Sequence, residues 1–152
     1  MKKSGQPIRV EVVVWGRAEP LIRPIRTTVF IHEQQVPEEL EWDGLDSDCA
    51  HVLAFNECGD AIGTARMRSN GRIGRMAVLK DWRGRGVGRA LLQMLLDLAV
   101  QQGLPRVTLS AQTHAIGFYE RAGFHAVGEP FIDAGIPHRK MERDIEHRPP
   151  LM

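Results

Sequence analysis

A glycine-rich segment with several arginines is the part of this sequence best suited to bind an anion. It reads Arg83-Gly84-Arg85-Gly86-Val87-Gly88 and is followed by Arg89. Glycines let the backbone approach a ligand closely. At the start of a helix, the first N–H groups can donate to an anion, and the partial positive charge of the helix N-terminus also attracts it. Guanidinium groups add fork-shaped donors that match phosphate oxygens. The segment therefore predicts a phosphate site.

Two common phosphate-binding motifs do not describe this segment. A P-loop requires Gly-Lys-Ser/Thr, which does not occur here. In a dinucleotide fingerprint that starts at Gly84, the third glycine would fall at Arg89, and no acidic residue closes the strand that follows Val107. The pattern that remains is Arg-x-x-Gly-x-Gly, in which Arg83, Gly86 and Gly88 are the defined positions.

A strand before this turn and a helix after it must position the phosphate site. Residues 72–79 have the pattern of a strand. Apolar residues at helical spacing predict a helix over 86–102, which Gly103 and Pro105 end. Residues 107–112 predict a buried strand parallel to 72–79.

The other segments complete an α+β domain. An acidic loop over 34–48 and a loop over 130–138 separate the regular elements. Further strands are predicted at 8–15, 49–56, 61–68, 124–129 and 139–144, and further helices at 18–32 and 115–122.

Two further motifs give the turn a family context. Met76-Ala77-Val78 precedes it, and Phe118-Tyr119-Glu-Arg-Ala-Gly123-Phe124 lies downstream. In this order and separation, the motifs resemble the coenzyme A signature of the GNAT acetyltransferase superfamily. The chain is most similar to small bacterial single-domain members that carry Val29-Phe30-x-x-Glu33-Gln34, Asp43-Gly44, Ala111-Gln112-x-His114 and Gly135-Ile136-Pro137-His138.

The resemblance implies a fold and a cofactor. The fold is a mostly antiparallel mixed sheet with a central parallel, splayed pair of strands, flanked by helices; it would span residues 8–145, with flexible termini at 1–7 and 146–152. The cofactor is acetyl-CoA. The residues implied to bind it are Met76, Ala77, Val78, Arg83, Gly84, Arg85, Gly86, Val87, Gly88, Arg89, Gln112 and His114.

The resemblance also suggests catalytic roles. Tyr119, the only tyrosine of the chain, matches the family's general acid, because a phenol can protonate a departing thiolate. A backbone N–H at Met76 or Val78 would polarise the thioester carbonyl. Glu33 is the first candidate for the general base, with His138 and His51 as rivals and a water chain as a further alternative.

The distribution of charge suggests the acceptor. Nine acids and no Lys or Arg lie between residues 27 and 65, whereas residues 66–89 carry eight Lys or Arg and one acid. Each charge alone is typical of a solvated surface, but the separation of sign suggests that one part binds a cation and another binds phosphate. We expect a primary amine of a small, cationic acceptor near Glu33, Glu41 and Asp43.

Other functional classes are less well supported. The net charge of +1 disfavours a nucleic-acid-binding module, and so does the basic stretch 66–89, in which Trp82 is the one aromatic residue among the arginines. A catalytically inactive acyl-CoA sensor is the nearer alternative. The two cysteines give no zinc spacing, so no metal is expected. No apolar run is long enough to cross a membrane, which favours the cytoplasm, and a homodimer is left open.

Overall fold

The computed structural model describes residues 7–146, and most of the two termini expected to be flexible lies outside this range. Its strands are β1 (Arg9–Val13), β2 (Ala50–Phe55), β3 (Ala61–Met67), β4 (Ile73–Val78), β5 (Arg106–Gln112), β6 (His125–Asp133) and β7 (Ile136–Asp144). Its α-helices are α1 (Trp15–Arg26), α2 (Glu38–Glu41), α3 (Val87–Gln101) and α4 (Ile116–Arg121). A π-helical segment, η2 (Thr27–Glu33), and three short 3-10 turns, η3 (Asp46–Asp48), η4 (Lys80–Trp82) and η5 (Thr113–Ala115), complete the described part of the chain. The structure confirms the predicted α+β class.

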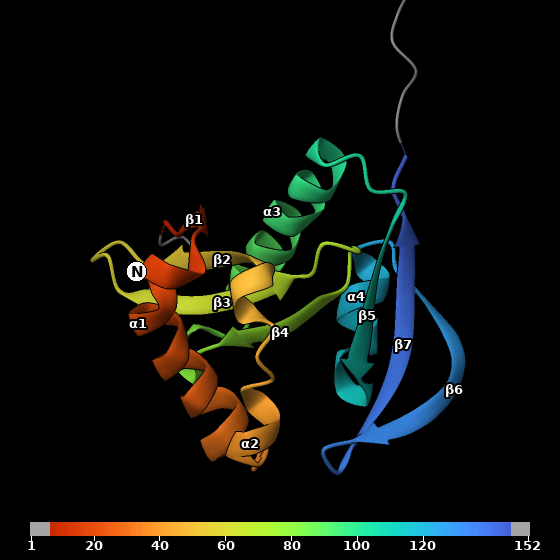
Figure 1. Ribbon diagram of the computed structural model, residues 1–152, viewed down its shortest axis with the longest axis horizontal. Coiled ribbons are helices and arrows are strands. Elements are labelled where there is room, and N and C mark those ends of the chain that lie inside the picture. Colours follow the sequence, from red (N-terminus) through yellow and green to blue (C-terminus); the bar gives the residue numbers. More distant parts are fainter. Residues whose placement is uncertain (1–6, 147–152) are drawn as a thin grey trace, which may run out of the picture.

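The strands form two antiparallel sheets that meet at one point. One has the order β1-β2-β3-β4 and the other β5-β7-β6. In the described chain a single parallel bridge, between Arg72 and Thr108, joins them. β4 and β5 therefore start side by side and then diverge, as Figure 1 shows for the yellow-green β4 and the teal β5. The predicted splayed pair is confirmed.

The first sheet is covered on both faces. Leu91 and Leu95 of α3 pack in one core with Met67 and Ile73. α1 packs in a second core with Leu53, whose two neighbours in β2 belong to the first core. Because side chains alternate along a strand, the two cores lie on opposite faces of the sheet.

The first helix differs from its predicted bounds. We expected it over 18–32, but it starts at Trp15, because the N–H groups of Arg17 and Ala18 bond to the Val14 carbonyl. From Thr27 it continues as the wider π-helix η2. π-helical segments are rare in proteins, and those that occur are often found at functional sites.

The predicted loop over 130–138 was wrong. β6 and β7 extend through it and join at Ala134 and Gly135, whose φ angles of 52° and 76° form a tight hairpin turn. Pro130, which suggested a loop, lies in an irregularity of the register between Val127 and Phe131. A proline is tolerated there because β6 is an edge strand.

Candidate active site

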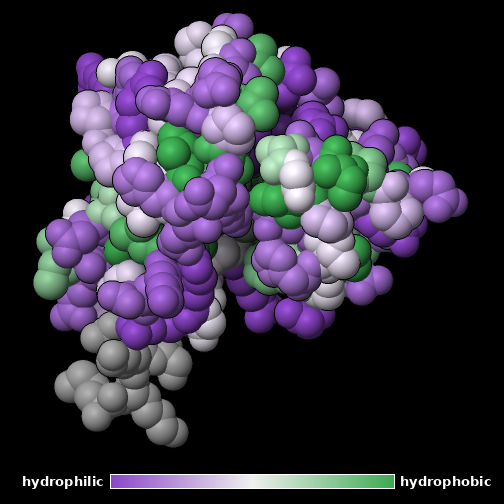
Figure 2. All heavy atoms as spheres, turned by 90° about the horizontal axis from the view of Figure 1, so that it is seen from below, coloured by the Kyte–Doolittle hydropathy of each residue, from purple (hydrophilic) through white to green (hydrophobic). Residues whose placement is uncertain are grey.

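The divergence of β4 and β5 opens a cleft of about 670 Å³. Seen from below in Figure 2, the part that carries the first helices and the part that carries the β6–β7 hairpin stand apart, with a recess between them. Its lining combines β4, the turn that follows it, the end of β5, α4 and the tip of the hairpin. The topology thus brings together three of the predicted motifs: Met76-Ala77-Val78, the glycine-rich turn and the Phe118-Tyr119 segment.

The glycine-rich turn forms a seat for an anion at one end of the cleft. Gly84 and Gly86 have φ angles of 75° and 84°, which glycine adopts without strain. Gly86 is the N-cap of α3 and provides no side-chain cap, and the first intrahelical bond runs from the Ala90 N–H to the Gly86 carbonyl at 3.0 Å. The N–H groups of Val87, Gly88 and Arg89 therefore have no partner within the helix. The backbone geometry that an anion cradle requires is present, and binding of a phosphate there stays a prediction.

The three arginines of the turn have different environments. Arg83 Nη2 donates to both carboxylate oxygens of Glu33, at 2.9 and 2.8 Å, and its Nε donates to the Val78 carbonyl. Arg85 stacks on Trp82, with 4.9 Å from the guanidinium to the ring centroid, and does not line the cleft. Arg89 is exposed and lines it. Arg89 is thus the arginine best placed to meet an anion.

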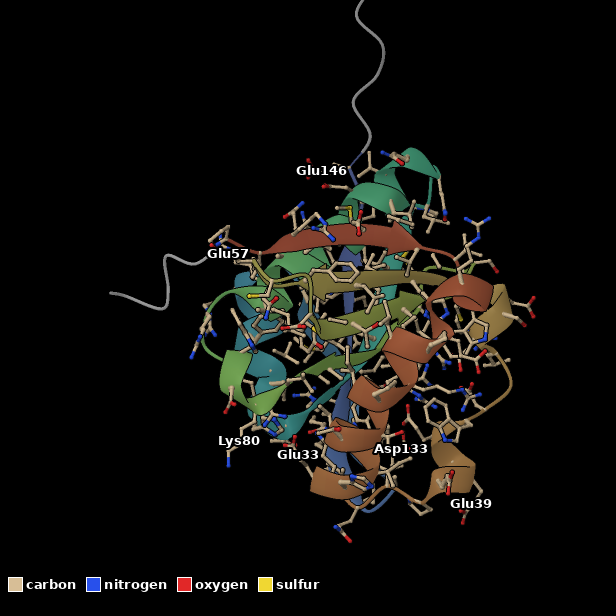
Figure 3. The ribbon with its side chains drawn as sticks, turned by 90° about the vertical axis from the view of Figure 1, so that its left-hand side faces the viewer. Glu33, Glu39, Glu57, Lys80, Asp133 and Glu146 are labelled. Carbon is tan, nitrogen blue, oxygen red and sulfur yellow. The ribbon has the colours of Figure 1, made fainter. Side chains whose placement is uncertain are left out.

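Glu33 lies beside the turn rather than on the lining of the cleft. In Figure 3 it is at the lower end of the molecule with Lys80 and Asp133, far from Glu57 and Glu146. Its bidentate pairing with Arg83 gives the carboxylate a structural partner. Its role as general base stays a prediction.

The two histidines proposed as bases lie in different places. His51 is buried, stacks on Trp15 and has its Nε2 2.8 Å from the Asp46 carbonyl, away from the cleft. His138 lines the cleft, and its Nδ1 is 2.6 Å from the Ile136 carbonyl. A carbonyl only accepts, so Nδ1 carries the hydrogen in this contact, which leaves the lone pair on Nε2 in the neutral form of the ring. His138 therefore has the tautomer that a base requires.

Tyr119 lies on the lining, opposite β4. Its hydroxyl is 3.8 Å from the Met76 sulfur, and the rings of Phe118 and Phe124 pack edge-on against it. Burial raises the pKa of Tyr119 to about 12, because the phenolate would lose its hydration. The phenol therefore remains a proton donor throughout the neutral range.

The backbone of β4 is irregular where Tyr119 faces it. Between Thr64 and Arg66 of β3 the register with β4 shifts, and Arg75 has a φ of 49°. Such a bulge interrupts the ladder and turns backbone groups outward. Met76 and Val78 line the cleft on either side of Ala77, whose side chain is buried in the α1 core.

This arrangement has known relatives. A family model described as "Acetyltransferase (GNAT) domain" matches residues 15–145. The chain belongs to the GNAT acetyltransferase family.

Relatives of this GNAT domain agree in sequence and in structure. The uncharacterized N-acetyltransferase YjcF of Bacillus subtilis is 37% identical over 123 residues, which cover 79% of this chain and 88% of the relative. The protein ElaA of Escherichia coli is 31% identical over 129 residues, covering 80% and 84%. The crystal structure of an acyl-CoA N-acyltransferase from Pseudomonas aeruginosa matches with a TM-score of 0.80 and 31% identity, covering 90% of this chain and 99% of that one.

Two further predicted residues of the GNAT domain lie on the same cleft. Gln112, at the end of β5, donates from Nε2 to the Gln34 side chain at 2.8 Å and so links β5 to the end of η2. His114, in η5, is exposed. Both line the cleft, and their contact with a cofactor stays a prediction.

Three carboxylates of the acidic loop, Glu41, Asp43 and Asp46, are paired with arginines of the same chain. Glu41 is 2% exposed, and its Oε2 accepts from Arg26 Nε at 2.7 Å. Asp43 binds Arg66 with both carboxylate oxygens. These contacts belong to an ionic cluster that consists of Arg26, Glu41, Asp43, Asp46, Arg66 and Arg75. Glu41 and Asp43 are therefore already paired inside the fold, so binding of a cationic acceptor by these two residues stays a prediction without free charge to support it.

Sequence reasoning missed some residues that line the cleft of this GNAT domain. Arg68, Arg72 and Ser110 line it, and none was singled out. The available signal was the position of the two arginines on either side of Ser69-Asn70-Gly71, a sequence typical of a turn, within the basic part of the chain. No helix in the described part of the chain is long and apolar enough to cross a membrane.

Proposed function

We propose that this GNAT protein transfers an acetyl group from acetyl-CoA directly to the primary amine of a small acceptor. The observation that carries the proposal is the anion seat at residues 84–89, where a helix N-terminus without a side-chain cap opens into the cleft beside Arg89. A diphosphate matches this seat in charge and in its need for several N–H donors. When bound, acetyl-CoA supplies an acetyl group already activated as a thioester.

The splayed strands suit the rest of the cofactor. An amide-rich, extended arm can pair with an exposed strand edge as an added strand. β4 offers such an edge beyond the bridge between Arg72 and Thr108, where β5 has moved away. An arm held there from the seat would extend toward Met76 and Tyr119.

The chain's own groups can then assist the reaction. The Tyr119 hydroxyl, now 3.8 Å from a methionine sulfur, can donate a proton to a leaving thiolate. A backbone N–H of the bulged segment, at Met76 or Val78, can stabilise charge on the carbonyl oxygen. The free nitrogen of His138 can accept the proton of the amine, and the pairing of Glu33 with Arg83 favours His138 over Glu33 for this role.

Thiol release from acetyl-CoA, measured with a panel of amines, tests the proposal. We expect turnover with at least one amine and a rise in melting temperature when coenzyme A is added. Tyr119→Phe keeps the ring but removes the donor, so kcat should fall on the order of a hundredfold while the coenzyme A shift is retained. A shift without turnover on any amine would support an acyl-CoA sensor instead, and the absence of a shift would refute the anion seat.

A further inference from the structure

We propose that the acceptor carries an anionic group, a carboxylate or a phosphate monoester a few bonds from its amine, and that Arg68 and Arg72 bind this group. The inference rests on the proposed function, because it names the class of amine that the cleft receives. The observation behind it is that the guanidinium groups of Arg68 and Arg72 lie outside the ionic cluster and pair with no carboxylate of the described residues.

The two arginines are neighbours across a hairpin. The register pairs Met67 with Ile73, and the Arg68 N–H donates to the Arg72 carbonyl at 2.8 Å, so Arg68 and Arg72 lie directly opposite each other. Opposite residues of an antiparallel pair project on the same face, with Cβ atoms about 5 Å apart. Like charges at this spacing destabilise a hairpin, and an anion bound between them removes the repulsion.

The charges around this pair are otherwise balanced. Three carboxylates and three arginines of the ionic cluster compensate one another. Within residues 7–146, Arg68 has no hydrogen-bond or ion-pair partner for its side chain, and the Arg72 guanidinium donates to the Ser110 hydroxyl at 2.9 Å but to no carboxylate. Besides Glu41 of the cluster, the lining contains one carboxylate, Asp133, at the tip of the β6–β7 hairpin. The arginine pair therefore gives this wall of the cleft an excess of positive charge.

The pair lies apart from the cofactor seat. Met67 and Ile73, which alternate with the arginines, face the α3 core, so Arg68 and Arg72 are on the face that α1 and α2 cover. Arg72 also precedes Val78 by six residues of β4, which at about 3.3 Å each is on the order of 20 Å from the turn that holds a diphosphate. A ligand that meets Arg68 and Arg72 thus approaches the Met76 and Tyr119 region from the side opposite to the cofactor.

The contact with Ser110 points to recognition rather than to a solvated pair. It crosses the junction of the two sheets, because Arg72 is in the bridge to Thr108 and Ser110 follows two residues later on β5. The hydroxyl uses one donor of Arg72 and fixes the guanidinium plane, so the remaining donors keep a defined direction. A planar carboxylate or a phosphate can then accept from both arginines.

Matched acceptor pairs test this inference in the thiol-release assay. Glycine is paired with glycinamide and O-phosphoethanolamine with ethanolamine, so that the members of each pair differ in the anionic group. β-Alanine is a further anionic acceptor, and putrescine is a cationic one. We expect at least one anionic amine to exceed its uncharged partner in kcat/KM by about ten- to a hundredfold, the effect of one or two charge-assisted hydrogen bonds. The carboxylate and phosphate arms show which anion is preferred. A preference for putrescine or for the uncharged partners would overturn the inference.

Variants separate binding from folding. Arg68→Gln and Arg72→Gln should each raise KM for the anionic acceptor about tenfold or more, leave KM for acetyl-CoA unchanged, and not lower the melting temperature, because they relieve repulsion. Arg72→Lys should recover part of the loss. Arg17→Gln, at an exposed arginine of α1 that does not line the cleft, is the matched control and should change neither KM. An unchanged acceptor KM in both cleft variants contradicts the proposal.

A binding measurement covers the case in which no amine is turned over. The melting temperature of the coenzyme A-saturated protein is recorded with each anionic amine, for the wild type and for an Arg68→Gln/Arg72→Gln double variant. Stabilisation of the wild type alone supports the anion site even if the acetyl transfer fails. Equal stabilisation of both proteins, or of neither, refutes it, whatever the outcome for the proposed reaction.

Discussion

Replacing Asp46 by asparagine should strongly destabilise the fold, because Asp46 joins two arginines inside a buried cluster. One oxygen, Oδ1, accepts from Arg26 Nη1 at 2.7 Å and from Arg66 Nη1 at 2.8 Å, and the residue is 6% exposed. The substitution leaves three arginines with two carboxylates in a buried cluster. Removing one partner of a buried ion pair costs about 3–5 kcal/mol, a large part of the roughly 5–15 kcal/mol that stabilises a typical domain.

Urea unfolding of Asp46→Asn beside Asp48→Asn measures this cost. Asp48 belongs to the same 3-10 turn, η3, but is exposed and makes no ion pair within the described residues, so its variant should stay within about 0.5 kcal/mol of the wild type. The Asp46 variant should also melt about 6–20 °C lower, at 2–4 °C for each kcal/mol. If the two variants differ by less than about 1 kcal/mol, the cluster does not hold the loop and the charge balance derived from it is wrong.

The same residue sets a dependence on pH. Burial acts to raise the pKa of Asp46, but hydrogen bonds from Arg26 and Arg66 outweigh it, and the net pKa is below 3.8. A lowered pKa contributes stability above the unfolded value, which is lost as the pH falls through the folded one. The wild type should therefore lose stability more steeply below about pH 3.8 than Asp46→Asn does.

Two further predictions concern the cleft. Tyr119 is the only tyrosine, so phenolate absorbance during a pH titration reports on it alone, and the midpoint of this titration should lie at about pH 12. The free energy of unfolding should decline as the pH rises from 10 toward 12, because the unfolded state loses the phenol proton first. A titration midpoint at pH 10 would show a solvated phenol. Glu33→Gln should leave the acidic limb of the pH profile of kcat in place, because the carboxylate is paired with Arg83, with exposed Glu39→Gln as its control. Disappearance of that limb in the Glu33 variant alone would make Glu33 the base.

The local motifs were readable from the sequence because their physics is local. Gly84 and Gly86 specify a left-handed turn at the start of a helix, whatever the rest of the chain does. The helical period from Val87 onward then sets the direction of α3, and with it the seat for an anion. The order of strands and helices followed from the same short-range patterns, as did the position of Tyr119 in a short helix downstream.

The partners of the charged residues were decided by the tertiary structure. Glu33 and Arg83 are 50 positions apart, and Arg26 and Asp46 are 20 apart, so no local pattern pairs them. Pro130 stands at the start of the predicted loop, but the structure places it in an edge strand, which tolerates proline. Packing of the loop onto the sheet determines which charges are neutralised inside the fold. Since binding depends on the charge left over, the nature of the acceptor becomes readable only once the chain has folded.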